Sequence, residues 1–121
     1  FDATNRAASS MAKIGEANGF AGGDAFVGES YDAAALMLLA MASAKSSDPQ
    51  VYKDHIMKVA NGTGEKIYPG ELAKGIKLAS YGVAIDYVGA SSVSLIGPGE
   101  AAGNFREIQI QNGKMVDVNY R

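Results

Sequence analysis

Several residue types that carry chemistry are scarce in this chain. It has no cysteine and a single histidine among its 121 residues. Without cysteine there is no disulfide, no thiolate metal site and no cysteine nucleophile. The lone histidine, His55, falls in the middle of an expected helix with no further metal ligands of suitable spacing near it. We therefore predict no metal site.

Charge of one sign is not concentrated anywhere in the sequence. The 11 basic and 13 acidic residues are spread along the chain and give a formal net charge of −2. A nucleic-acid interface needs clustered Lys and Arg to meet the phosphates, so no nucleic-acid partner is expected. With 47% hydrophobic and 20% charged residues, the composition is typical of one globular domain with a real core.

Recognisable catalytic motifs are missing as well. Residues 62–66, GTGEK, lack both the P-loop spacing and the Ser or Thr that follows its lysine. No stretch resembles a nucleophile elbow. Asp24, Glu29 and Asp32 form no evident acid–base pair, and we interpret them as helix caps and solvated groups. The sequence predicts neither an enzyme nor a cofactor.

A long hydrophobic run of membrane-spanning length is also absent. The most apolar stretch, Ser30 to Ala44, reads SYDAAALMLLAMASA and is too short and too rich in Ala and Ser to cross a bilayer. Ala, Leu and Met are strong helix formers, and no Gly or Pro interrupts them. The stretch is apolar over most of its girth, which predicts a central helix buried on several sides.

Helices are expected before strands along the chain. Besides the central helix, the patterns predict helices over 2–18, 49–60 and 71–80, separated by turns rich in the 15 glycines. Short strands are expected over 92–96, 105–111 and 114–120, with a brief one at 25–27, a loop over 61–70 and a turn at 97–99. This order is typical of an α+β protein, unless a partner sheet is missing from the chain.

The last two strands are predicted to form a hairpin around Asn112-Gly113. A two-residue loop would place Ile108 opposite Asp117 and mix the two faces. A three-residue loop, 111–113, would place Ile108 opposite Val116 and collect the aliphatic side chains on one face. Because a slip of one residue moves every side chain to the other face, the pattern favours the three-residue loop.

Aromatic residues flank the expected start of the central helix. Phe26 and Tyr31 lie on either side of Glu29 and Ser30. A helix N-terminus offers free N–H donors and the positive end of the dipole, and Phe26 offers a flat apolar wall. Together they could line a pocket for a small polar molecule. The alternative is that Phe26 and Tyr31 only seal the helix end into the core.

Three stretches carry a resemblance to a known family. They are FVGESYDAAAL from Phe26, YPGEL from Tyr68 running on to IDYVGAS at 85–91, and the closing EIQIQNGKMV from Glu107. In this order and spacing they resemble the C-terminal part of the extracytoplasmic solute-binding proteins of ABC importers, of the branched-chain amino acid type. One departure is the run 95–100, LIGPGE, where the family usually has an Asp-rich turn.

The resemblance implies a fold and a function beyond what the residues give. It implies an α/β chain, part of the two-lobed type I periplasmic-binding-protein fold. Residues 1–121 would be its C-terminal segment, with a mainly helical lobe portion over 1–90 and a hinge crossing and terminal strands over 91–121. It implies extracytoplasmic location, a leader and an N-terminal part that this chain lacks, and delivery of an amino acid or amide to an ABC permease at the membrane.

The same resemblance implies a ligand site but no catalysis. Phe26 falls where the family has an aromatic residue at the cleft edge, and we add its neighbours Glu29 and Tyr31 as candidate ligand-binding residues. Two other hypotheses stay open. One is a ligand-sensing domain of a receptor or regulator with the same fold, and the other is a small stand-alone interaction domain. A fragment would expose apolar surface and could form a homodimer.

Overall fold

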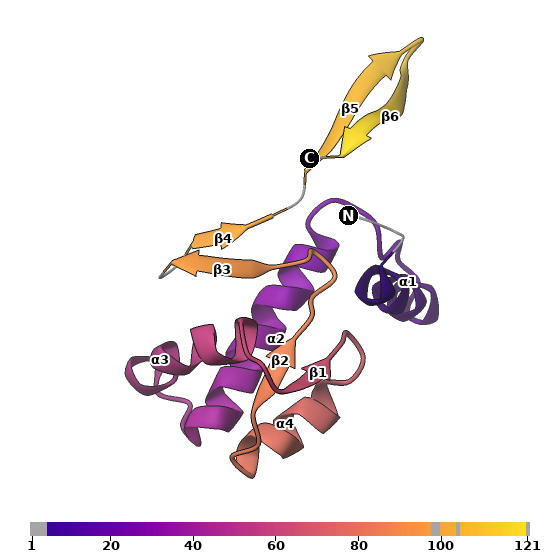
Figure 1. Cartoon of the computed structure of the whole chain (residues 1–121). Helices are drawn as coiled ribbons and strands as arrows, with labels where there is room; N and C mark the ends of the chain where they lie inside the picture. The colour runs from indigo at the N-terminus through magenta and orange to yellow at the C-terminus, as the bar shows by residue number, and fades with distance from the viewer. Residues whose placement is uncertain (1–4, 98–99, 104, 121) are drawn as a thin grey trace.

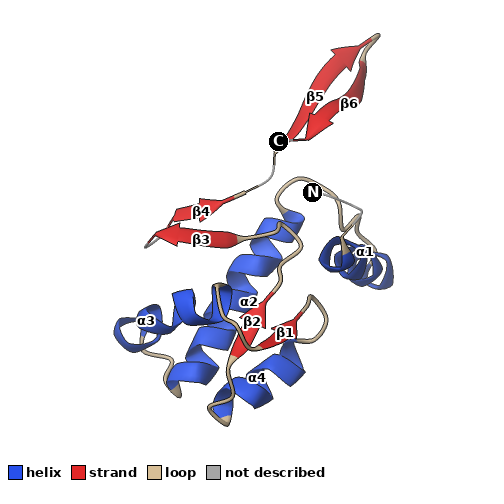
Figure 2. Cartoon of the chain, in the orientation of Figure 1, coloured by secondary structure: helices blue, strands red, loops and turns tan. Residues whose placement is uncertain are grey.

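The computed structural model describes residues 5–97, 100–103 and 105–120, which form four helices and three two-stranded sheets (Figures 1 and 2). The chain is thus of mixed α/β class. The helices and the first sheet form one body, and the C-terminal hairpin extends away from it (Figure 1).

The predicted helices are confirmed, and their ends follow the expected capping chemistry. They are α1 (Arg6–Asn18), α2 (Val27–Ala44), α3 (Pro49–Ala60) and α4 (Leu72–Ser80). Asn5 caps α1 by accepting a hydrogen bond of 2.7 Å from the Ala8 N–H, and Asp48 caps α3 in the same way from Gln50. The strand expected at 25–27 is wrong, because the chain turns at Phe26 and α2 starts at Val27.

A parallel βαβ unit occupies the middle of the chain, where only a loop and a helix were expected. Strand β1 (Glu65–Ile67) pairs in parallel with β2 (Ile85–Tyr87), and α4 connects them. The prediction of helices first and strands later is therefore wrong, and so is the loop prediction for 61–70. Three-residue strands are too short to show an alternating pattern, which is why the sequence concealed them.

Helix α2 lies at the centre of the hydrophobic core, as predicted. It packs against both α3 and α4. Leu39 of α2, Ile67 of β1 and Tyr87 of β2 are among the largest fully buried side chains. Met37 and Leu38 remain partly exposed on the same helix, so the described chain covers α2 only on some of its sides.

A short antiparallel pair follows the βαβ unit. Strand β3 (Ser94–Gly97) confirms the strand expected near 92–96, displaced by one or two residues. Its partner β4 (Glu100–Ala102) was not predicted. The turn expected at 97–99 includes residues 98 and 99, which lie outside the described residues.

The C-terminal hairpin is present, but its predicted register is wrong. Strands β5 (Arg106–Gln111) and β6 (Lys114–Tyr120) are joined by the two residues Asn112 and Gly113, both at positive φ, 51° and 74°. Ile108 therefore pairs with Asp117, and a bulge follows in the register. Positive φ at both positions suits a type I′ turn, whose twist matches that of the strands. Every described residue of the two strands is exposed, so no buried face opposes this register.

Candidate functional site

Phe26 holds an unusual backbone conformation at the start of α2. Its φ of 66° and ψ of −2° are left-handed, and a bulky residue in that region costs about 1–3 kcal/mol. The turn is maintained by backbone hydrogen bonds from Val27 N to Asp24 O and from Ser30 N to Phe26 O. The side chain is 76% exposed. Phe26 thus does not seal the helix end into the core, which excludes that alternative for this residue.

Phe26 and Glu29 line one groove, which we call the α2 groove. It has a volume of about 570 Å³ and runs between the first turns of α2, the segment after β2, and β4. Its other lining side chains are mainly apolar: Ala33, Leu36, Val93, Leu95, Ala101 and Phe105. Glu29 is exposed, and within the described ranges no side chain or backbone group bonds to its carboxylate. The groove therefore offers an apolar bed with one uncommitted negative charge at its edge.

Tyr31 does not reach the α2 groove. It lines a separate hollow of about 510 Å³ beside α1, together with Met11, Phe20 and Phe26. Its hydroxyl accepts a hydrogen bond of 3.0 Å from the Gly70 N–H and so holds the loop between β1 and α4. Of the three sequence-predicted site residues, Phe26 and Glu29 line the α2 groove, whereas Tyr31 shares only the separate hollow with Phe26 and bonds to Gly70.

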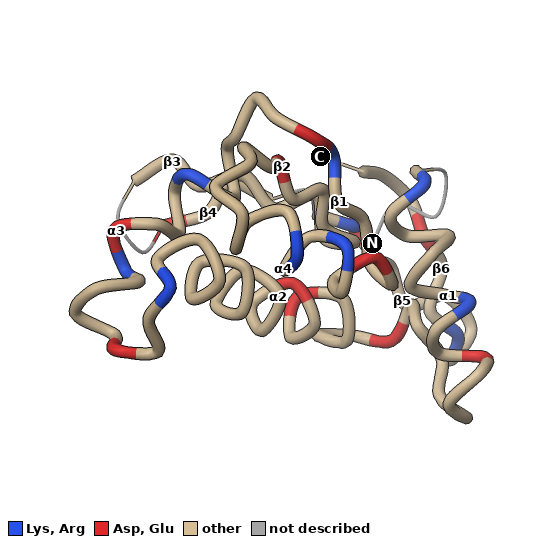
Figure 3. The backbone as a smooth tube through the Cα atoms, turned by 90° about the horizontal axis from the view of Figure 1, so that it is seen from below, with Lys and Arg blue, Asp and Glu red and all other residues tan. Residues whose placement is uncertain are grey.

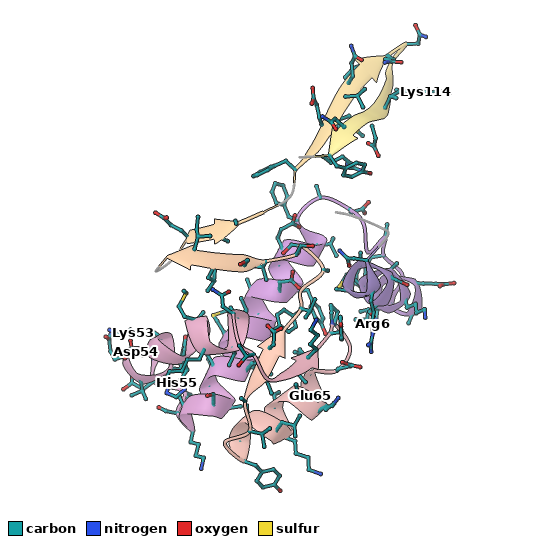
Figure 4. The ribbon with its side chains drawn as sticks, in the orientation of Figure 1. Arg6, Lys53, Asp54, His55, Glu65 and Lys114 are labelled. Carbon is teal, nitrogen blue, oxygen red and sulfur yellow. The ribbon has the colours of Figure 1, made fainter. Side chains whose placement is uncertain are left out.

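The loop that Tyr31 contacts is also fastened from α1. Arg6 places its guanidinium 4.0 Å from the centre of the Tyr68 ring and forms an ion pair of 3.1 Å with Glu71. Figure 4 shows Arg6 on α1, on the opposite side of the helical body from Lys53, Asp54 and His55 on α3. Tyr31 is thus part of a structural junction between α1, α2 and the loop before α4.

Asp32 is the residue that sequence reasoning misjudged most. It is 2% exposed, not solvated, and its carboxylate accepts four hydrogen bonds, one from Tyr87 at the end of β2 and three from the segment after β2. Oδ1 accepts from the Tyr87 hydroxyl at 2.8 Å and the Ala90 N–H at 3.0 Å; Oδ2 accepts from the Ser91 N–H at 2.8 Å and the Ser91 hydroxyl at 2.6 Å. The available signal was its place as the one charge in the mainly apolar stretch Ser30 to Ala44.

The phenol of Tyr87 responds to the same contact. Burial raises its pKa well above the usual range, and the charge of the Asp32 carboxylate and its hydrogen bond add to the shift. The phenol therefore keeps its proton, and donates to the Asp32 carboxylate, to a higher pH than a free tyrosine would.

The remaining polar candidates take structural positions. His55 is half-buried on α3, and its Nδ1 lies 2.9 Å from the Ser43 hydroxyl. Residues 65 and 66 of the GTGEK run belong to β1. No group of three potential metal ligands occurs within residues 5–97, 100–103 and 105–120. Positions of acidic and basic residues are scattered along the backbone (Figure 3). None of the helices described is long and apolar enough to cross a membrane.

Comparison with known proteins adds no relative. No family model matches the chain, and neither the curated proteins nor the solved structures contain a match to it. The function must therefore be argued from the site itself.

Proposed function

We propose that the chain belongs to an extracytoplasmic solute-binding protein of an ABC importer and binds an amino acid or amide in the α2 groove. The observation that carries this proposal is Phe26, an aromatic side chain held exposed by a strained backbone, above an apolar groove and beside a free carboxylate. Strain of this kind persists where the surrounding structure enforces it, often at ligand sites. The role proposed is binding, without catalysis or a cofactor.

The chemistry of the groove favours a small amphipathic ligand. Leu36, Val93 and Leu95 offer an aliphatic bed for a branched side chain. The carboxylate of Glu29 suits an ammonium group, and the face of the Phe26 ring attracts a cation or covers an aliphatic chain. Asp32 also borders the groove, but its four hydrogen bonds leave it no free acceptor. A branched-chain amino acid combines the required ammonium group and apolar body.

Contact between two stretches of the resemblance supports the family assignment. Asp32 of the YDA stretch accepts hydrogen bonds from Tyr87, Ala90 and Ser91 of the IDYVGAS stretch. Two stretches that are more than 50 residues apart thus form one structural unit. A shared unit of this kind gives both stretches a physical reason to occur together.

The open parts of the structure support a place within a larger two-lobed protein. Within the part of the chain that the structure describes, the parallel sheet of β1 and β2 has two strands, although parallel sheets normally are wider and covered on both faces. Both faces of the β5–β6 hairpin are exposed. We infer that the N-terminal part of the same protein supplies further strands and the second wall of the cleft. Extracytoplasmic location and docking on a permease follow from this assignment.

Ligand binding to the chain can be tested by NMR. A ¹⁵N-labelled sample would be titrated with L-leucine, L-isoleucine, L-valine and their amides up to tens of millimolar. One wall of a cleft should bind weakly, with Kd on the order of 1 mM or above, equal to about −4 kcal/mol or less favourable. The expected shifts cluster at 26–33 and 91–95. Absence of any shift, or shifts elsewhere only, would overturn the ligand class.

Matched variants assign the site within that titration. Phe26→Ala should abolish the shifts, whereas Phe20→Ala, which removes a partly exposed aromatic from the other hollow, should preserve them. Glu29→Gln should weaken binding of the amino acids, whereas Glu16→Gln on the exposed face of α1 should not. Equal effects of Phe20→Ala and Phe26→Ala would place the site elsewhere.

A further inference from the structure

We propose that Asp32 is a positioning residue for the α2 groove. Its hydrogen bonds to Tyr87, Ala90 and Ser91, which we call the lock, hold the first turns of α2, which carry Phe26, against the opposite wall of the groove. The opposite wall is the segment 87–93, of which Ser91 and Val93 line the groove. This inference rests on the proposed function, because it concerns the geometry of that same groove. Asp32 acts through Phe26 and Ser91 and does not itself touch the ligand.

The hydrogen bonds of Asp32 hold the end of β2 and the segment after it at three residues. The carboxylate accepts hydrogen bonds from the hydroxyl of Tyr87, from the backbone N–H of Ala90, and from both the backbone N–H and the hydroxyl of Ser91. Charge-assisted bonds of 2.6 to 3.0 Å in a buried site are strong and directional. Because two N–H groups are held, the path of the backbone itself is fixed, and with it the direction in which the chain enters β3.

Two glycines let the walls approach each other closely enough for this lock. A Cβ on Gly89 would overlap the carboxylate of Asp32, so only glycine leaves room for it. A Cβ on Gly28, in the first turn of α2, would lie 3.4 Å from the Cβ of Ala90. The first turns of α2 therefore lie directly on the segment 89–91, and Phe26 immediately precedes these turns as the N-cap of α2.

The lock accounts for the strained conformation of Phe26. Among the described residues, no side chain caps the N-terminus of α2. The turn at Phe26 therefore depends on backbone hydrogen bonds and on the packing of the first turns of α2 against the segment 89–91. Asp32 seats them, about one and a half turns further along the helix. Releasing Asp32 should let Phe26 leave the left-handed region and let the groove widen.

The test compares Asp32→Asn with Val59→Ala in the full chain. Asn keeps the shape of Asp but presents an amide N–H₂ to a donor, whereas Val59 is buried on α3 away from the groove and serves as a control for lost stability. At a temperature where both variants are folded, we expect Asp32→Asn to weaken L-leucine binding at least tenfold and Val59→Ala less than twofold. Equal losses in the two variants would show a merely structural role and overturn the proposal.

A second readout needs no ligand. The ¹³Cα shift and the HN–Hα coupling of Phe26 report the left-handed conformation, and the exchange rates of the Ala90 and Ser91 amides report the lock. All of them should change in Asp32→Asn and not in Val59→Ala. If they do not change, the positioning role fails. If the wild-type chain binds no amino acid, the proposed function fails, and these signals still decide whether the lock holds Phe26.

A milder variant covers the case in which Asp32→Asn does not fold. Ser91→Ala removes one donor and leaves the carboxylate three. We expect a loss of affinity of about threefold, an intermediate shift of Phe26 and faster exchange of the Ser91 amide. A folded Ser91→Ala variant with the wild-type affinity and the wild-type Phe26 signals would overturn the proposal.

Discussion

Two aspartates whose sequence neighbours are mainly apolar lie in opposite environments in this molecule. Asp32 lies on α2 among Ala and Leu, is 2% exposed and accepts four hydrogen bonds. Asp117 lies on β6 between Val116 and Val118, and its side chain is 44% exposed. It pairs with Arg106 at 3.6 Å and receives the Tyr120 hydroxyl at 3.3 Å. Similar local sequence thus leads to a buried lock in one region and a solvated ion pair in the other.

The difference comes from what stands opposite each element. Helix α2 meets α3, α4 and the segment after β2, which supply both apolar contacts and hydrogen-bond donors. The hairpin strands pair with each other and project from the body (Figure 1). A two-stranded hairpin alone is marginally stable in water. The comparison predicts that equivalent substitutions will be costly around α2 and nearly neutral in the hairpin.

The largest effect is expected from Leu39→Ala. Leu39 is completely buried in the core around α2, whereas its neighbour Leu38 is 45% exposed. The cavity left by Leu39→Ala should lower the free energy of unfolding by about 3 kcal/mol. Leu38→Ala should lower it by less than about 1 kcal/mol. Urea denaturation measures both, and similar losses would mean that the exposed face of α2 is covered in solution.

Gly89→Ala should have the next largest effect. The new Cβ would overlap the Asp32 carboxylate, so the lock or the segment 87–91 must shift. We expect a loss of about 2 kcal/mol, as for overpacking of a tight site. Gly103→Ala is the matched control, because a Cβ there meets no described atom within 4 Å. Its effect should stay within about 0.5 kcal/mol. A neutral Gly89→Ala would contradict the close approach of the two walls.

The sequence predicts the parts of this fold whose signals are local. The positions of the four helices and the apolar composition of α2 depend on neighbours within a few residues. Phe26 and Glu29 were placed together for the same reason, since both belong to one helix end. These predictions needed no knowledge of the rest of the chain.

What the sequence concealed depends on distant partners. The bonds between Asp32 and Ser91 join residues 59 apart, so a lone charge in an apolar stretch can indicate burial but cannot identify the donors. The hairpin register failed for the opposite reason. A rule that assumes one buried face was applied to strands that have none, and the preference of Asn-Gly for a tight turn decided instead.

High pH should lower the free energy of unfolding through Tyr87, which lies in the core around α2. The pKa of Tyr87 is raised in the folded state, so above the unfolded pKa of about 10 the phenol ionises more readily in the unfolded chain. The contribution of the protonated phenol to stability is therefore complete below that pH and is lost as the pH rises above it. From pH 9 to 11 the wild type should lose about 1.4 kcal/mol more than Tyr87→Phe, which has no phenol to protect. Tyr81→Phe, at an exposed position, should follow the wild type. Urea denaturation at each pH measures the difference, and parallel pH curves for all three proteins would contradict the burial of Tyr87.

The smallest expected effects come from removing one methyl group in each region. Ile67 is fully buried, and Ile110 in the hairpin is 67% exposed. Ile67→Val should cost about 1 kcal/mol, whereas Ile110→Val should change the free energy of unfolding by no more than a few tenths. Hydrogen exchange should agree, with slow amides around β1 and β2 and fast ones in β5 and β6. A comparable cost for Ile110→Val would mean that something covers the hairpin in solution. Light scattering would then tell a homodimer, whose mass is twice that of the chain, from a monomer with a folded-back hairpin. A dimer would explain the cost through the exposed edges of β5 and β6, which are open to a second copy of this chain.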